Sequence, residues 1–231
     1  MDHADRCGVP LRMTLLLIVL AAVASPGVAQ RPPVIGIVEL PGLFGTRDPD
    51  GPPGLTPPRH VQPIPIHVAP TSGSDILARV TDAQEIEVAE YDYEAPGALT
   101  HDVRDGWYLI GVVTPAGRTS GWLPPQYAGR LHSLPTLLVD GLAYLTEAWD
   151  RKLFPAAGAA STGRLLDVAT GRADVIVRQA RESGGRLWLE VDVLGPGRCR
   201  QADPPPVVAR GWVPAHASDG RPNAWFYSRG C

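Results

Sequence analysis

The tetrapeptide Gly-Trp-aliphatic-Pro occurs twice in this chain, as GWLP at 121–124 and as GWVP at 211–214. The segments before the two copies align in the same order: IHVAPTSG (66–73) with KLFPAAG (152–158), ILARV (76–80) with GRLLDV (163–168), EIEVAEY (85–91) with ADVIVRQA (173–180), and RDGWYLIGVV (104–113) with GGRLWLEVDVL (184–194). The added length of the second copy falls in one hairpin, where surface loops tolerate insertions. The alignment therefore predicts one small fold, present twice.

The aligned segments have the pattern of β-strands. Residues 85–91 alternate apolar and acidic side chains, which predicts a strand with one buried face. Residues 105–113 predict another strand, which a hairpin loop at 114–120 joins to GWLP. The chain of 231 residues contains 25 glycines and 25 prolines, which suits short strands and turns. We therefore expect an all-β fold.

Two segments lie outside the aligned copies. Residues 34–40 predict a short strand, followed by a Pro/Gly-rich loop at 45–60 that cannot be helical. Residues 131–149 fit either a short amphipathic helix or a strand, and a strand is favoured because 34–40 stands at the equivalent place before the first copy. HDVRD (101–105) is expected in a solvated turn.

The N-terminus has the features of a signal peptide. Two arginines precede an apolar run of about 12 residues at 13–24, which is the length of an h-region and too short to span a bilayer. Small residues follow Pro26, so we expect cleavage after Ala29, with Ala24 as the alternative site and an uncleaved anchor as the alternative fate. The mature chain is expected to be periplasmic or secreted and to have no membrane span.

Cleavage would remove Cys7 and leave Cys199 and Cys231. An even number of cysteines in an exported chain predicts one disulfide. The bridge would close a loop of about 33 residues and add roughly 3–4 kcal/mol in the chain-entropy model. The alternative is a pair of free thiols, but neither a Cys-x-x-Cys motif nor a histidine cluster accompanies them.

The charge and the polar residues argue against several functional classes. A net charge of −3 gives no electrostatic basis for binding nucleic acid. The histidines of the mature chain are well separated, and neither a metal-ligand motif nor a nucleophile elbow accompanies them. We therefore expect a non-catalytic protein with no metal and no cofactor.

The ordered set of segments resembles the bacterial SH3-type (SH3b) domain, in two copies. The resemblance covers 62–130 and 148–231. It implies two small five- or six-stranded barrels in tandem, with roles such as wall targeting, peptide or glycan binding, or regulation of an enzyme. The expected organisation is a signal peptide (1–29), an N-terminal strand and loop (30–61), repeat 1 (62–130), a connecting strand (131–147), and repeat 2 with the disulfide (148–231).

GWLPPQY (121–127) is also similar to the Gly-x-x-Pro-x-x-Tyr segment of peptide-binding SH3 domains, where proline and tyrosine line the groove. AEYDYEA (89–95) is similar to the opening of those domains but lies at the wrong place in the order. The second copy has Ala217 where Tyr127 would fall, so a groove is expected in the first repeat alone. The candidate ligand-binding residues are Trp107, Tyr108, Trp122, Pro124 and Tyr127.

The aromatic residues can serve either packing or binding. At least one tryptophan per repeat must fill a core, and strand alternation places Trp107 and Tyr108 on opposite faces. We expect a binding module for peptidoglycan or for a periplasmic protein or peptide. The alternative is a scaffold, or an inhibitor of a cell-envelope enzyme, with no groove of its own.

Overall fold

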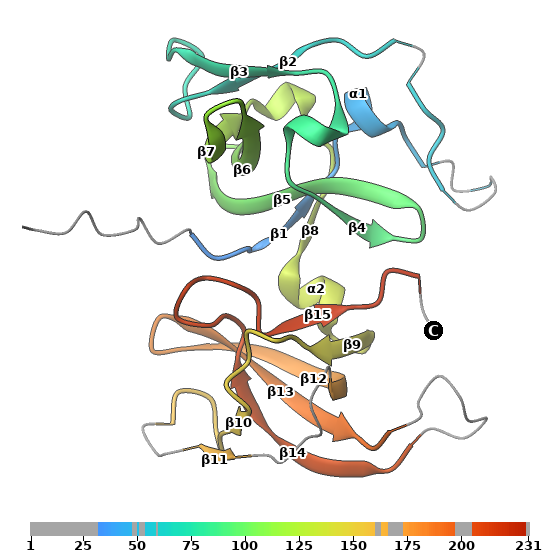
Figure 1. Ribbon diagram of the computed structural model, residues 1–231, viewed down its shortest axis with the longest axis vertical. Coiled ribbons are helices and arrows are strands. Elements are labelled where there is room, and N and C mark those ends of the chain that lie inside the picture. The colour runs from blue at the N-terminus through green and yellow to red at the C-terminus, as the bar shows by residue number, and fades with distance from the viewer. Residues whose placement is uncertain are drawn as a thin grey trace, which may run out of the picture. The chain divides into compact units, whose positions relative to one another are not determined.

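The computed structural model describes residues 32–47, 50, 54–58, 60–159, 163–165, 173–196 and 205–229. Residues 31–231 form one compact unit (Figure 1). The predicted signal peptide and all three cysteines lie outside the described residues, so export and the Cys199–Cys231 disulfide stay predictions. Within the described residues, no helix is long and apolar enough to cross a membrane.

The fold is all-β, as predicted, with a few short helical turns. The first half contains β1 (Gly36–Val38), α1 (Pro41–Phe44), β2 (Ile64–His67), β3 (Ile76–Val80), η1 (Ala83–Glu85), β4 (Val88–Asp92), β5 (Ala95–Arg104), β6 (Trp107–Thr114), β7 (Gly117–Leu123), η2 (Pro125–Tyr127) and β8 (Leu131–Ser133). The second half contains α2 (Leu134–Leu138), β9 (Leu142–Leu145), β10 (Lys152–Leu153), β11 (Arg164–Leu165), β12 (Ala173–Ser183), β13 (Arg186–Leu194), β14 (Val207–Pro214) and β15 (Ala224–Phe226).

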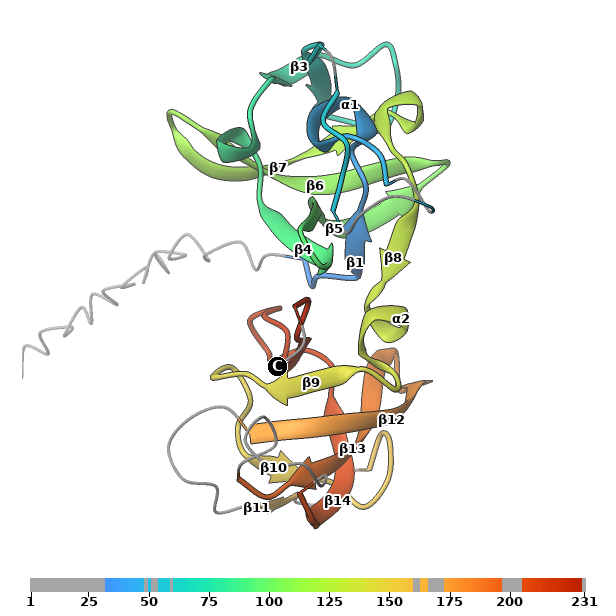
Figure 2. The same cartoon turned by 90° about the vertical axis from the view of Figure 1, so that its right-hand side faces the viewer.

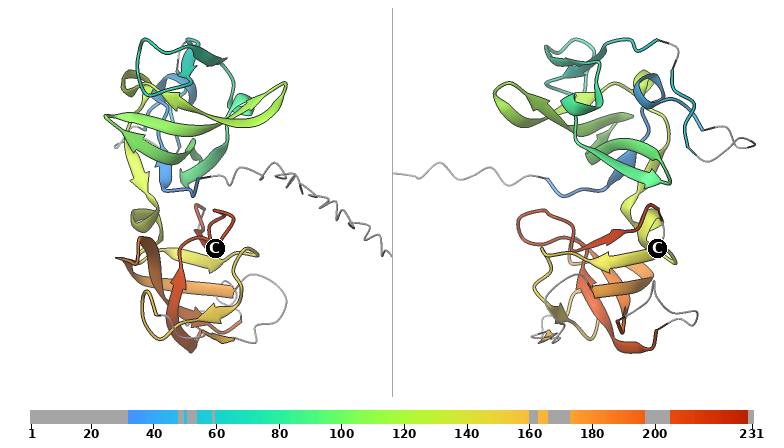
Figure 3. Two further views of the ribbon diagram at one scale, coloured as in Figure 1. Left: turned by 90° about the vertical axis from the view of Figure 1, so that its left-hand side faces the viewer. Right: turned by 45° about the vertical axis from the view of Figure 1, so that its right-hand side comes forward.

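The strands form two main sheets and a two-stranded ribbon. The first sheet has the order β3-β2-β7-β6-β5-β1-β8, with β4 paired to β5, and the second has the order β14-β13-β12-β9-β15. Both contain the same five-strand run, because β7-β6-β5-β1-β8 matches β14-β13-β12-β9-β15. Figure 2 shows β8 returning beside β1, and Figure 3 shows β9 (yellow) between β12 (orange) and β15 (red). Neither sheet closes on itself.

The repeat is therefore longer than the sequence alignment indicated. It begins with the opening strand, β1 or β9, and ends with a return strand, β8 or β15, that pairs with it. A further strand crosses near the Gly-Trp pair in each half: His67 of β2 pairs with Trp122, and Phe154 beside β10 pairs with Trp212. The two copies thus share their central hairpins, their closing strands and this crossing.

Strand β5 was missed by the sequence analysis. HDVRD was expected in a turn, but residues 101–104 belong to β5, and only Asp105 and Gly106 form the turn. Pro96 and Gly97 look like strand breakers. Gly97 instead permits a close crossing, because a Cβ there would lie 2.6 Å from Ile37 Cγ2 and 2.7 Å from the Val38 carbonyl oxygen.

The missed strand also corrects the alignment. β12 pairs with the opening strand β9 and with β13, as β5 pairs with β1 and β6, so β5 rather than 85–91 is its counterpart. Residues 85–91 are divided between η1, a bridge at Ile86, and β4. The expected burial of the apolar face is wrong here, because Glu87 is buried and Val88 is exposed.

The segment 131–149 combines both interpretations that the sequence left open. Residues 131–133 and 142–145 are strands, while residues 134–138 form a helix of five residues. Ser133 caps this helix, because its hydroxyl accepts the backbone N–H of Thr136. Leu134 and Leu138 are fully buried, so packing rather than helix propensity stabilises so short a helix.

The buried side chains form two clusters. The first includes Ile64, Ile66, Ile110 and Leu123, all from the first half, and the second is built mainly on β9 and β12–β15. Strand β1 contributes to both, because alternation turns Val38 toward the first cluster and Ile37 toward the second. Ile37 therefore ties the opening strand of the first half to the core of the second.

The described part of the C-terminal segment is attached to β4. The Ser228 hydroxyl and the Arg229 guanidinium both donate to the Glu90 carboxylate, each at 2.9 Å. The hydrogen bond from Arg229 lowers the pKa of Glu90 below its usual value. These hydrogen bonds hold the chain after β15 against β4, and they do not depend on the predicted disulfide.

Candidate functional site

The structure places the five predicted ligand-binding residues on or beside one hairpin. Trp107 and Tyr108 begin β6, Trp122 is near the end of β7, Pro124 precedes η2, and Tyr127 ends η2. Trp122 and Pro124 are buried, while Trp107, Tyr108 and Tyr127 are partly buried. Any groove in the first half would therefore be formed by these three aromatics.

Burial of the repeated Gly-Trp pair follows from the strand crossing. A Cβ on Gly121 would lie 2.5 Å from Ile66 Cγ2, and a Cβ on Gly211 would lie 2.9 Å from Leu153 Cβ. A side chain at either glycine would therefore displace the crossing strand. The adjacent tryptophans are 6% and 8% exposed at Trp122 and Trp212. The shared motif therefore serves packing in both halves, and Trp122, a candidate ligand-binding residue, is a core residue.

A second aromatic pair also recurs. Trp107 lies edge-to-face with His67, with ring centroids 5.2 Å apart, and Trp188 lies edge-to-face with Phe154 at 5.3 Å. The strand registers make Trp107 and Trp188 equivalent, since each lies two residues before the partner of the buried tryptophan. Edge-to-face packing is a favoured geometry for aromatic rings.

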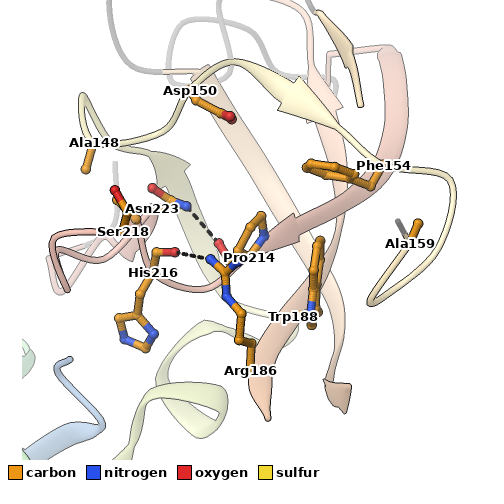
Figure 4. Close-up of a pocket in the computed structure, with 11 residues that line it drawn as sticks. Ala148, Asp150, Phe154, Ala159, Arg186, Trp188, Pro214, His216, Ser218 and Asn223 are labelled. Carbon is orange, nitrogen blue, oxygen red and sulfur yellow. Dashed lines mark hydrogen bonds between the residues drawn. The ribbon is translucent and has the colours of Figure 1, made fainter. Parts of the chain in front are cut away.

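Next to the pair in the second half lies a pocket of about 360 Å³ (Figure 4). Phe154 and Trp188 form its aromatic wall, and three alanines, Ala148, Ala159 and Ala217, leave it open. The segment 215–223, between β14 and β15, supplies another wall. The volume lies near the lower end of the range for small-molecule sites, which is roughly 300–1,000 Å³.

Asn223 is the most deeply buried polar side chain of this pocket, at 4% exposure. Its Nδ2 donates to the Pro214 carbonyl at 3.0 Å, which fixes Oδ1 as the atom facing away from that carbonyl. Among the residues that the structure describes, Oδ1 has no hydrogen-bond partner. An unsatisfied buried acceptor costs roughly 1–3 kcal/mol. Less than 1 Å² of this oxygen is accessible, so a ligand in the pocket does not reach it in this structure.

Arg186 supplies a positive charge at the same wall. One guanidinium nitrogen donates to the His216 carbonyl at 3.3 Å, and the guanidinium lies 5.9 Å from the centre of the Trp188 ring. No described carboxylate lies within ion-pair distance of Arg186. The Asp150 carboxylate on another wall is paired with Lys152 at 3.2 Å.

His216 contributes its carbonyl to the pocket, while its ring points away from it (Figure 4). The ring Nε2 donates to the Val34 carbonyl at 2.7 Å. Burial lowers the pKa of His216 from its usual 6.5, with smaller contributions in the same direction from Arg186 and His101. The imidazole is therefore neutral at pH 7, and Arg186 and Asp150 are the charged groups that line the pocket.

No sequence pattern predicted this pocket. In the second copy Ala217 stands where Tyr127 would fall, which argued against a groove there, yet Ala217 leaves the space open. One signal was available, because nine residues (215–223) join GWVP to its return strand, compared with six (125–130) that join GWLP to β8. Polar residues in the longer connection, including Ser218 and Asn223, are the ones that line the pocket.

The described residues contain no cluster of three or more metal-ligating side chains. A pocket with an aromatic wall, one guanidinium and one carboxylate can bind a polar ligand. No family model, no curated protein and no solved structure matches this chain.

Proposed function

We propose that the protein is an exported, non-catalytic binding module with two tandem SH3-like units, and that it recognises a cell-wall component such as peptidoglycan or a periplasmic protein. The repeated five-strand order supports the tandem arrangement. The signal-peptide pattern of the N-terminus supports export. The SH3-like assignment rests on the order of the sequence segments.

The pocket beside Trp188 is the observation that carries the binding role. Its aromatic wall offers apolar contact, and Arg186 offers a charged polar contact, which is the usual composition of a ligand site. The ring of His216 is held by Val34, so it is not directed at a ligand in the pocket. These features favour recognition over chemistry.

Filling the pocket tests this proposal. Ala217→Phe would occupy the cavity without removing a core side chain, and Ala116→Phe in the exposed β6–β7 turn is a matched control. We expect the wild type and the control to bind purified peptidoglycan in a pull-down, or to crosslink to a periplasmic protein, and Ala217→Phe to lose that binding. The absence of binding in both assays would reject the binding role.

A second candidate is a scaffold or inhibitor of a cell-envelope enzyme. Burial of Trp122 and Pro124 favours it, because it removes two of the five residues from the predicted groove. In this case a protein partner would crosslink equally to the wild type and to Ala217→Phe. The same experiment thus separates the two candidates.

A further inference from the structure

The segment that leads into β1 is held at its backbone by two histidines. Residues 32–34 are Pro-Pro-Val, and the two prolines have no N–H to donate. The carbonyl of Pro32 accepts a hydrogen bond from His101 Nδ1 at 2.8 Å, and the carbonyl of Val34 accepts one from His216 Nε2 at 2.7 Å. Within the part of the chain that the structure describes, these are the hydrogen bonds of this segment. Its attachment therefore depends on side chains whose charge changes near neutral pH.

The two histidines belong to different halves of the molecule. His101 is on β5, and His216 is in the segment between β14 and β15. Together the halves hold the peptide unit that joins Val34 to Ile35. Its carbonyl accepts from His216, while its N–H donates to the Thr100 carbonyl of β5 at 2.8 Å. His216 is thus the polar contact through which the second half holds this peptide unit.

The surroundings of the two rings differ in charge. His101 Nε2 lies 4.0 Å from the Glu87 carboxylate, so a proton on His101 would lie beside a negative group. Among the described residues, the charged or titratable groups that act on His216 are Arg186 of β13 and His101 of β5, and residues 32–34 supply none. Burial lowers the pKa of His216 from its usual 6.5, and Arg186 and His101 add to this effect.

We propose that His216 is an acid-sensitive latch, which holds the segment before β1 against the second half at neutral pH and releases it in acid. The neutral ring already donates from Nε2, so the added proton must go to Nδ1, in a buried site near Arg186. A protonated ring is therefore more favourable in water than in the closed latch, and protonation favours opening. The latch needs no ligand in the pocket, so it can be tested separately from the binding role.

His216 also connects the latch to the pocket. Its carbonyl accepts a hydrogen bond from Arg186 at 3.3 Å, while its ring points away from the pocket (Figure 4) and holds Val34. A movement of His216 would therefore act on two sites, the segment before β1 and the charged wall of the pocket. An acidic environment would change both together.

Hydrogen exchange measured by NMR tests the latch on the full chain. The Ile35 N–H belongs to the peptide unit that His216 holds, so its protection factor reports local opening. At pH 7.5 we expect Ile35 to be less protected than Val191, which is fully buried and paired on both sides. At pH 5.5 the protection of Ile35 should fall severalfold, up to about tenfold, which is the limit for a group with a pKa of about 6.5 in the open state.

A matched pair of variants assigns the effect to one side chain. His216→Gln keeps an N–H donor that does not titrate, so we expect equal protection of Ile35 at the two pH values. His60→Gln replaces an exposed histidine and should behave as the wild type. If His216→Gln does not fold, the wild type gives a second measurement. The ¹⁵N shifts of the His216 imidazole and the amide shift of Ile35 should follow one titration curve, with a midpoint below pH 6.5.

Three results would overturn the latch. The first is a protection of Ile35 that is the same at both pH values in the wild type, or different titration curves for His216 and Ile35. The second is an unchanged pH dependence in His216→Gln. The third is equal protection of Ile35 and Val191, which would mean that the segment before β1 is released only when the whole protein unfolds.

Discussion

The two halves of the molecule share a framework and differ in what they place around it. Each has the same five-strand order, a buried Gly-Trp crossing and an edge-to-face aromatic pair. The first half pairs Trp107 with a histidine and returns through 124–130, and the second pairs Trp188 with a phenylalanine and returns through 215–223. The difference teaches that the strands preserve packing while the return segments carry different side chains, and that of the second half lines a pocket.

A buried carboxylate is also common to the two halves, but each half supplies it from a different part of the repeat. Gly111 of β6 and Asp192 of β13 are equivalent, since each lies opposite the residue before the Gly-Trp pair. The Asp192 side chain is fully buried, and its hydrogen bond from Arg210 contributes most to lowering its pKa. In the first half, Glu87 reaches over Gly111 and lies 3.6 Å from Arg118. The two halves thus fill one position with a carboxylate from different parts of the repeat, Asp192 from β13 and Glu87 from the residue before β4.

Truncating the buried tryptophans would have the largest effect and would test whether the two crossings are equally important. We expect Trp122→Ala and Trp212→Ala each to lower the free energy of unfolding by about 3–5 kcal/mol, because both fill a core position. Urea denaturation followed by circular dichroism measures this, with the exposed Tyr93→Ala as the control. A loss below about 1 kcal/mol in one half would show that its crossing does not support the fold.

Moving the buried carboxylate tests the equivalence of Gly111 and Asp192. Gly111→Asp should destabilise the protein by about 3 kcal/mol, because its Cβ would lie 2.4 Å from Glu87 Oε2 and add a second buried carboxylate. Adding Glu87→Ala should recover at least about 1 kcal/mol, since one carboxylate would remain. Gly73→Asp, with open space around it, is the control. Additive losses in the double variant would contradict the equivalence.

The pH dependence of stability should distinguish the return segment of the second half. The native pKa of His216 is lowered from 6.5, so the unfolded chain binds the proton more tightly. The stability that depends on a neutral His216 is therefore fully present above about pH 6.5, and it is lost as the pH falls below that value. Urea unfolding at pH 7.5, 6.5 and 5.5 should show a shallower decline in His216→Gln than in wild type.

The exposed His60→Gln provides the control for that comparison. Among the described residues, the carboxylates with lowered pKa values are Glu85, Glu90, Asp192 and Asp219. They lose their contribution only below about pH 4.5, outside this window. If the free energy of unfolding fell equally steeply with pH in His216→Gln and in wild type, protonation of His216 would have no effect on the stability of the fold. The first-half return segment, 124–130, contains no histidine and adds no such dependence.

Local patterns were sufficient to predict much of the strand framework. Strand β3 was predicted at 76–80, which are its bounds in the structure, and the equivalence of 34–40 with a strand before the second copy is confirmed by β1 and β9. These features depend on residue type and alternation along the chain. The hairpin of β6 and β7 was predictable for the same reason.

Features that depend on distant segments were not predictable. Pro96 and Gly97 look like breakers unless the crossing of β1 is known. The buried position of Glu87 depends on the space over Gly111, and the unpaired oxygen of Asn223 depends on where β14 places the Pro214 carbonyl. An alternating pattern cannot indicate either contact, because both join residues brought together by folding.

Tyr127 and Ala217 provide the finest test of which half binds. Tyr127 packs half-buried against the first core cluster, so Tyr127→Ala should cost about 1 kcal/mol in stability. Because the pocket lies in the second half, we expect Tyr127→Ala to retain peptidoglycan or partner binding in the same assay in which Ala217→Phe loses it. The opposite result would assign the site to the three partly buried aromatics of the first half. Loss in both variants would mean that the ligand contacts both halves, so that the pocket forms only part of a larger binding surface.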